Sequence, residues 1–200
     1  MSVPTPSGGG TDEFELVIAG AGGFGRTVLQ FALDASVSVV GFTDDRPDVV
    51  FGRKGQYRVI GPATALVGRA SWRLIVAVGD PESRKALVQR LSHLSLPWFT
   101  LVHPLAYVAP TARIGDGCIV GPFAFIGPDA ILGDHVAVNA HGYVDHDVCV
   151  GAYGYVGPRG TISGSAQLGE CVAVGAGATI GYGAVVAPYS RVRPGVVIES

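Results

Sequence analysis

His146 and Asp147 are the residues whose types and spacing first suggest chemistry in this 200-residue chain. A neutral imidazole can accept a proton from an amine or a hydroxyl, and a neighbouring carboxylate holds its tautomer and raises its basicity. A solvated surface histidine is the simpler interpretation of this residue alone. The pair lies, however, in a polar interval, residues 139–151, that also contains Asn139 and His141. We therefore treat His146 as a candidate general base and Asp147 as its acidic partner.

A six-residue repeat surrounds this interval. Leu, Ile or Val occupies every sixth position from Val102 to Ile198, 17 positions without a slip. A fixed hexapeptide period indicates a parallel β-helix, here about five coils of three hexads each. Glycine often follows the aliphatic residue, and we interpret it as the place where the backbone turns without a Cβ. Asn139 and Asp145 replace that glycine in two successive hexads, so we expect the polar side chains nearby to have no role in the turns.

A second candidate site lies far upstream, in the motif Gly20-Ala21-Gly22-Gly23-Phe24-Gly25. It follows an apolar run and precedes a helical pattern, so its amides could bind a phosphate at a helix N-terminus. Asp44 lies 19 residues after Gly25, near the position of a ribose-binding carboxylate in a nucleotide-binding unit. A tight strand-to-helix turn is the alternative for this motif.

The elements around the glycine motif predict a small α/β domain. Apolar strands at 14–19, 37–43 and 74–78 alternate with helical patterns, and residues 46–58 look like a loop. This alternation is typical of a parallel sheet. The size is half of a doubly wound domain, which suits a mononucleotide or nucleotide-sugar better than a dinucleotide. The domains that we expect are a disordered tail (1–13), a nucleotide-sugar-binding α/β domain (14–100) and a β-helix (101–200).

Composition narrows the functional class. A net charge of −2 and a pI near 6.2 argue against a nucleic-acid surface. The sequence has no 18-residue apolar run, so we expect no membrane span, and the N-terminus lacks the apolar segment of a signal peptide. The three cysteines show no metal-type spacing, which fits a reducing cytoplasm and a protein without a bound metal.

From about Phe14 onward, the chain resembles the PglD/NeuD-like nucleotide-sugar N-acetyltransferases, a hexapeptide-repeat family of bacterial glycan biosynthesis. The matching segments occur in the family's order and cover most of the chain. They are GAGGFG, FTDD, VAVGDPESR, LVHPLAYVAPTARIG and NAHGYVDHDVCVG.

The resemblance implies a left-handed β-helix, a homotrimer with active sites between adjacent subunits, and acetyl-CoA as co-substrate. It also implies His146 as catalytic base and Asp147 as the residue that supports it. Substrate contacts would come from Gly22, Gly23, Phe24, Asp44, Asp45, Gly79 and Asn139, and acetyl-CoA contacts from Tyr155 and Ala176. The chain departs from the family at Phe24, where the family usually has histidine, and at Tyr155, where a second histidine often lies.

The function that we expect is acetyl transfer from acetyl-CoA to the amine of a nucleotide-linked amino sugar, by direct attack. A sugar O-acetyltransferase and a non-catalytic nucleotide-sugar-binding module are alternatives. A further alternative is a zinc enzyme resembling γ-type carbonic anhydrases, because His141 and His146 are five residues apart. Its third histidine should lie about two coils upstream, where Leu105 and Pro110 stand instead.

Overall fold

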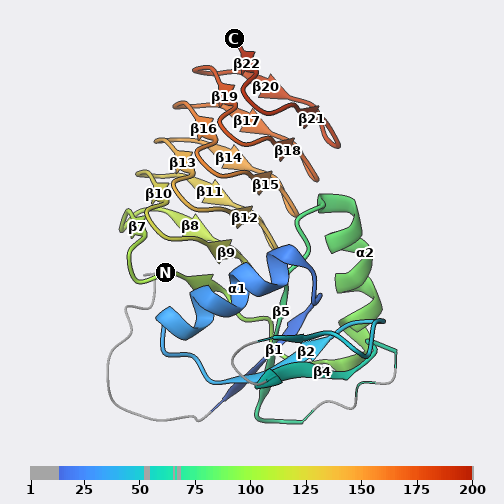
Figure 1. The fold of residues 1–200 in the computed structure, drawn as a ribbon. Coiled ribbons are helices and arrows are strands. Elements are labelled where there is room, and N and C mark those ends of the chain that lie inside the picture. Colours follow the sequence, from blue (N-terminus) through green and yellow to red (C-terminus); the bar gives the residue numbers. More distant parts are fainter. Residues whose placement is uncertain (1–13, 52–54, 65, 67–68, 200) are drawn as a thin grey trace.

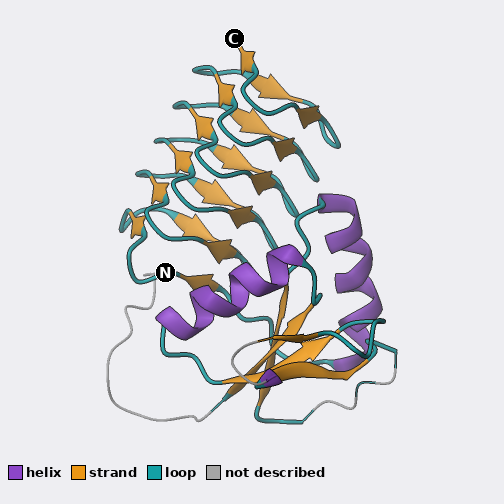
Figure 2. Cartoon of the chain, viewed as in Figure 1, coloured by secondary structure: helices purple, strands orange, loops and turns teal. Residues whose placement is uncertain are grey.

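A computed structural model describes residues 14–199, apart from 52–54, 65 and 67–68. The tail expected at residues 1–13 lies outside these residues. Figure 1 shows a small α/β domain at the base of a long solenoid, and Figure 2 shows the solenoid as a stack of short strands. The predicted fold class, a half-Rossmann-like α/β domain followed by a left-handed parallel β-helix, is confirmed. No helix within the described ranges is long and apolar enough to cross a membrane.

The α/β domain is built on a five-stranded sheet with the order β3-β4-β2-β1-β5. All neighbours pair in parallel except β3 and β4, which are antiparallel. The prediction of a loop at 46–58 was wrong, because β3 and the start of β4 lie there. These two strands extend the sheet beyond β2. The bounds are β1 Glu15–Ala19, α1 Gly23–Asp34, β2 Val39–Thr43, β3 Val50–Phe51, β4 Tyr57–Gly61, β5 Trp72–Val76, α2 Pro81–Leu91 and the 3-10 helix η2 Ser92–Leu94.

Local sequence explains where the two helices begin. Asp80 caps α2, since its carboxylate accepts a hydrogen bond from the Ser83 N–H at 2.9 Å, and Pro81 occupies the first turn. The junction between β1 and α1 needs two glycines, Gly20 in the turn and Gly25 in the first turn of the helix. Gly20 has a φ of +102°, and a Cβ on Gly25 would lie 2.1 Å from the Gly20 carbonyl oxygen.

The solenoid consists of two-residue strands, and each strand pairs in parallel with the strand 18 residues further along. Sheet 1 contains β6, β9, β12, β15, β18 and β21; sheet 2 contains β7, β10, β13, β16, β19 and β22; sheet 3 contains β8, β11, β14, β17 and β20. The bounds are β6 Leu101–Val102, β7 Tyr107–Val108, β8 Arg113–Ile114, β9 Ile119–Val120, β10 Phe125–Ile126, β11 Ile131–Leu132, β12 Ala137–Val138, β13 Tyr143–Val144, β14 Cys149–Val150, β15 Tyr155–Val156, β16 Thr161–Ile162, β17 Gln167–Leu168, β18 Ala173–Val174, β19 Thr179–Ile180, β20 Val185–Val186, β21 Arg191–Val192 and β22 Val197–Ile198. The repeated aliphatic residue ends each strand and fills the interior, where the middle coils bury it.

The turns lie elsewhere than expected. Every sixth residue from Gly117 to Gly195 has a φ between +56° and +71°, three positions after the aliphatic residue, whatever its type. In the hexads where glycine directly follows the aliphatic residue, its role is a different one, because a Cβ added there would lie against the backbone of the next coil. At Gly127, for example, it would lie 2.7 Å from the carbonyl carbon of Asp145. His141 and Asp147 occupy left-handed turn positions, so the expectation that they have no turn role was wrong.

Arg84 of α2 fastens the α/β domain to the solenoid. Its guanidinium is almost fully buried and donates only to backbone carbonyls. Within its own domain it bonds Val78 O and Gly79 O at 2.6 and 3.1 Å. Across the domain junction it bonds His135 O at 2.9 Å, Tyr153 O at 2.5 Å and Gly154 O at 2.9 Å. The loop that follows β5 is thereby held against the turns between sheet 3 and sheet 1.

The apolar part of this junction covers the outer face of sheet 1. Leu101, Ile119 and Ala137 share one buried cluster with residues of α1. This contact agrees with Figure 1, in which α1 lies between the small sheet and the first coils. Sheet 1 is therefore the side of the solenoid that faces the glycine motif.

Candidate active site

His146 and Asp147 form the corner between β13 in sheet 2 and β14 in sheet 3. The His146 Nδ1 lies 2.8 Å from Asp147 Oδ2, and the His146 backbone N–H donates to Asp145 Oδ1 at 2.8 Å. The hydrogen bond to Asp147 raises the pKa of His146 above its usual value, and the charge of Asp145 adds to this effect. A proton on Nδ1, donated to Asp147, leaves Nε2 as the basic nitrogen. The sequence prediction of an imidazole beside a carboxylate thus has the geometry of a general base.

Gly164, one coil further along, makes room for the outer nitrogen of His146. A Cβ at this position would lie 2.6 Å from Nε2 and 2.7 Å from Cε1 of the imidazole. The residue has no positive φ that would demand glycine for backbone reasons. The space is therefore a property of the site rather than of the turn.

Replacing Gly164 with alanine is expected to lower kcat by roughly 10²-fold, because a displacement of the base by about 1 Å has effects of this size. The side chain of His146 can move aside, so thermal stability should change little. Gln167→Ala, on the exposed face of the same coil, is the matched control. Steady-state kinetics and thermal unfolding of both variants test this, and unchanged kcat in Gly164→Ala would show that Nε2 is not used.

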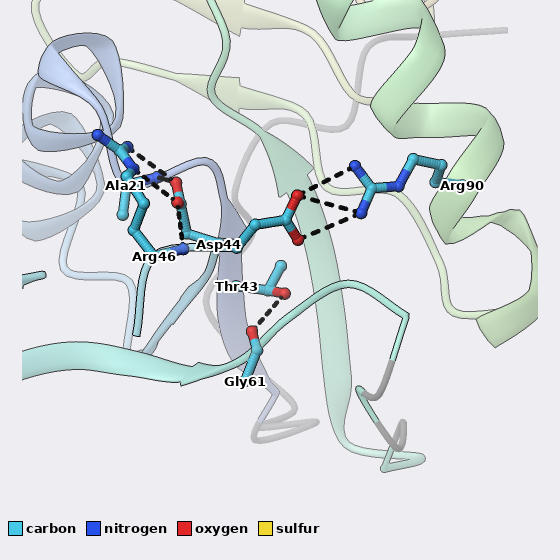
Figure 3. Close-up of polar contacts among 7 residues, drawn as sticks. Ala21, Thr43, Asp44, Arg46, Gly61 and Arg90 are labelled. Atoms are coloured by element: carbon cyan, nitrogen blue, oxygen red, sulfur yellow. Dashed lines mark hydrogen bonds and ion pairs between the residues drawn. The ribbon is translucent and has the colours of Figure 1, made fainter. Parts of the chain in front are cut away.

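The glycine motif and the two aspartates form a second group. Asp44 Oδ2 accepts the Ala21 N–H at 2.7 Å, and Asp44 Oδ1 lies 2.9 Å from Arg46 Nε (Figure 3). The contact with Arg46 lowers the pKa of Asp44 to about 2. Gly22 caps α1 without a side-chain hydrogen bond, and the first turn of α1 contains no acidic residue. The first amides of α1 are thus available to an anion.

A pocket of about 350 Å³ opens beside this group, between the end of β2 and α2. Asp44 and Asp45 lie on one side of it, and Arg90 on the other, with its Nη2 3.2 Å from Asp45 Oδ1. Neither Arg46 nor Arg90 was identified from the sequence. Arg90 is 45 residues from Asp45, and no local pattern connects them.

Phe24 and Tyr155, the two departures from the family pattern, touch each other. Their rings meet edge to face with centroids 5.9 Å apart. The Tyr155 hydroxyl accepts a hydrogen bond from Asn139 Nδ2 at 3.1 Å, which brings three predicted residues together. A change at one of these aromatic positions therefore alters the surroundings of the other.

A groove of about 370 Å³ adjoins this cluster. Its lining includes Gly79, Tyr155, Gly175 and Arg193, from the loop after β5 and from the later coils. Ala176 is exposed in the turn after β18, the strand that pairs with the strand of Tyr155. Tyr155 and Ala176 thus lie along one edge of the solenoid.

One chain does not bring its two groups together. His146 lies at the corner between sheets 2 and 3, whereas the α/β domain packs on sheet 1, the opposite side of the triangular coil. The residues around the glycine motif and the candidate base are consequently on different sides of the same solenoid.

His141 lies at another corner, between sheets 1 and 2, where its ring stacks on Phe123 with centroids 5.0 Å apart. The five-residue spacing to His146 therefore spans two corners and does not place both side chains in one site of the chain. Within the described residues, no group of three or more His, Cys, Asp or Glu side chains is arranged to hold a metal ion.

Comparison with known proteins agrees with this fold. Residues 15–91 match the PglD N-terminal domain family. The acetyltransferase domain of PglB from Neisseria gonorrhoeae is 29% identical, with a TM-score of 0.84 over 92% of this chain and 90% of that chain. A mutant perosamine N-acetyltransferase from Caulobacter crescentus, solved with CoA and GDP-perosamine, is 27% identical, with a TM-score of 0.84 over 93% of this chain and 89% of that chain.

A curated relative is an uncharacterised protein of Acanthamoeba polyphaga mimivirus, 30% identical over 101 residues. The match covers 50% of this chain, and the chain spans only a fifth of that protein's length. The fold and the matches place the chain among hexapeptide-repeat proteins with an added α/β domain. The α/β domain matches the PglD N-terminal domain family over residues 15–91, and the resemblance to PglD-like nucleotide-sugar N-acetyltransferases predicted from the sequence is confirmed.

Proposed function

We propose that this protein transfers the acetyl group of acetyl-CoA to the amine of a nucleotide-linked amino sugar, with His146 as general base. The observation that carries the proposal is the 2.8 Å contact between His146 Nδ1 and Asp147, with the imidazole lying over Gly164, where a Cβ would come within 2.6 Å of Nε2. The relatives support the substrate class, because solved forms of perosamine N-acetyltransferase contain CoA and GDP-perosamine.

In the proposed reaction, the neutral amine attacks the thioester carbonyl while Nε2 of His146 accepts the amine proton. Asp147 stabilises the imidazolium that forms, and backbone N–H groups of the coil turns stabilise the oxyanion. The tetrahedral intermediate then expels the CoA sulfur, which takes the proton back from His146. The reaction needs no covalent nucleophile and no metal.

We assign the binding roles to the pocket at Asp44 and Asp45 and to the groove at Tyr155. The nucleotide would occupy the pocket beside Asp44 and Asp45, with its phosphates near the amides of Gly22, Gly23 and Phe24. Gly79 and Asn139 would face the sugar. Acetyl-CoA would extend along the groove at Tyr155 toward Ala176.

A homotrimer would complete the site, because His146 and the glycine motif of one chain lie on opposite sides of the solenoid. His146 of one subunit would then act on the sugar held by its neighbour. Sheet 2 offers a surface for this contact, a ladder of Tyr107, Phe125 and Tyr143 with ring centroids 5.1 and 4.8 Å apart. Tyr107 and Tyr143 are exposed, and Phe125 between them is half-buried. A contiguous aromatic patch of this kind is typical of protein interfaces.

Replacing Phe125 with aspartate is expected to convert the trimer into monomers, because a charge in the middle of the ladder would be buried without a partner. Light scattering after size exclusion measures the mass, and activity should disappear with the trimer. Tyr107→Asp, at the end of the ladder, should weaken association in the same direction. Gln167→Asp on sheet 3 is the control. If both ladder variants remain stable trimers, the interface lies elsewhere on the solenoid.

The function is tested by incubating the protein with acetyl-CoA and a panel of GDP-, UDP- and dTDP-amino sugars while free thiol is measured. Thiol release only with sugars that carry an amine supports the proposal. Release with nucleotide sugars that carry only hydroxyl groups would favour the O-acetyltransferase. Nucleotide-sugar binding without any thiol release would favour the non-catalytic module.

A further inference from the structure

Asp45 and Arg90 face each other across the mouth of the nucleotide pocket and come from different elements. Asp45 follows β2, and Arg90 lies in the last turn of α2. Both terminal nitrogens of Arg90 approach the carboxylate, at distances of 3.2 to 3.4 Å (Figure 3). These contacts are longer than the 2.7–2.9 Å typical of a charge-assisted hydrogen bond. A ligand could therefore form hydrogen bonds with both Asp45 and Arg90.

Asp44 and Asp45 are adjacent, but they are placed for different tasks. Both oxygens of Asp44 are engaged by Ala21 and Arg46, and its side chain is only 12% exposed. The side chain of Asp45 is 65% exposed, and among the described residues its carboxylate pairs with Arg90 alone. Asp44 thus holds the glycine motif in place, whereas Asp45 is available to read a ligand.

The walls of the pocket suit the flat faces of a base. Ala63, Val78, Ala86 and Leu87 supply apolar surface, and Gly20 also lines the pocket. The volume of about 350 Å³ lies within the range of small-molecule sites. The charged groups of the lining are Asp44, Asp45 and Arg90, and of these Asp45 and Arg90 pair with each other.

We infer that this pocket selects guanine over uracil and thymine, with Asp45 and Arg90 reading the edge of the base; the inference rests on the proposed function of the site. Guanine presents the acceptor O6 beside the two donors N1–H and N2–H. Arg90 can donate to O6, while the two oxygens of Asp45 accept the two N–H groups. The pair thus matches the whole edge of guanine.

The other bases leave a mismatch. Uracil and thymine present acceptor, donor and acceptor, so one oxygen of Asp45 would face O2 with no proton between them. Adenine is a purine of similar size, but its N1 is an acceptor and would also face the carboxylate. Selection would therefore follow from hydrogen-bonding pattern and not from size. The wrong base loses one arm of this two-point contact, and that loss is what discriminates against it.

Calorimetric titration of the whole protein with GDP, UDP, dTDP and ADP tests the inference without any need for turnover. We expect GDP to bind at least about tenfold more tightly than the other three, since a bidentate contact discriminates by this much or more. Asp45→Asn replaces one acceptor with a donor. It should weaken GDP binding by about tenfold to a hundredfold and reduce the preference over UDP.

Asp48→Asn, an exposed aspartate outside the pocket lining, is the matched control and should bind all four nucleotides as the unchanged protein does. Equal affinity for the four nucleotides would overturn the inference, and so would a GDP preference that survives in Asp45→Asn. Acetylation of UDP- or dTDP-amino sugars with no GDP preference would overturn it while the proposed function stands. GDP selection without acetyl transfer to any amino sugar would support it and overturn the proposed function instead.

Discussion

Replacing His146 with alanine is expected to lower kcat by about 10²- to 10⁴-fold, the range that general base catalysis supplies. The imidazole is half exposed at a corner of the solenoid, and its side chain lies outside the buried core. Thermal stability and nucleotide-sugar binding should therefore change little. Steady-state kinetics at saturating substrate measure the effect, and near-full activity would remove His146 from the mechanism.

His141→Ala is the matched control for this prediction. His141 also lies at a turn, but at another corner, and stacks on Phe123. It should keep kcat within a few-fold of the unchanged enzyme. A loss as large as that of His146→Ala would point to a role for both histidines.

The pH profile tests the contribution of Asp147. The hydrogen bond to Asp147 raises the pKa of His146, and only the neutral imidazole can accept the proton. Activity should therefore rise as the pH increases through the pKa of His146. In Asp147→Asn this pKa falls, so the acidic limb should move to lower pH while the plateau rate decreases. If the acidic limb does not move in Asp147→Asn, it reflects the titration of a different group.

Replacing Arg84 with methionine is expected to lower the free energy of unfolding by about 3 kcal/mol or more, because each buried carbonyl that loses its donor costs about 1–3 kcal/mol. Methionine keeps much of the buried stem but donates to none of the five carbonyls. Burial lowers the pKa of Arg84 to about 10, so the guanidinium is still charged near neutral pH. Three of these carbonyls belong to the solenoid, so the docking of the two domains should weaken most.

Urea unfolding followed by tryptophan fluorescence measures this effect, because Trp72 lies in the small sheet and Trp98 immediately precedes the solenoid. Lys85→Met is the control, since this neighbour in α2 makes a surface ion pair with Glu170 and should contribute much less. A separate early transition of the α/β domain in Arg84→Met would show that docking had failed. An unchanged unfolding curve would mean that the carbonyls find other donors.

The sequence by itself determined the scaffold and the pairing of His146 with Asp147 at one corner. The six-residue period predicts the coil because each aliphatic residue must return to the same interior, a constraint that every hexad repeats. His146 and Asp147 are neighbours in the chain, so their pairing needs no distant contact. The glycine motif with Asp44 was predicted for a similar reason, because a strand, a turn and a helix define it locally.

Only the tertiary structure decided how these parts meet. The glycines after the aliphatic residues avoid the next coil, 18 residues away, and this contact is invisible in a local pattern. Asp45 meets Arg90, and Arg84 joins the loop after β5 to the turns at His135 and Tyr153, across long separations in sequence. The packing of α1 on sheet 1 places the pocket at Asp44 and Asp45 on the opposite side of the solenoid from His146. Such contacts depend on which faces the domains bury together, and a sequence read element by element does not specify that choice.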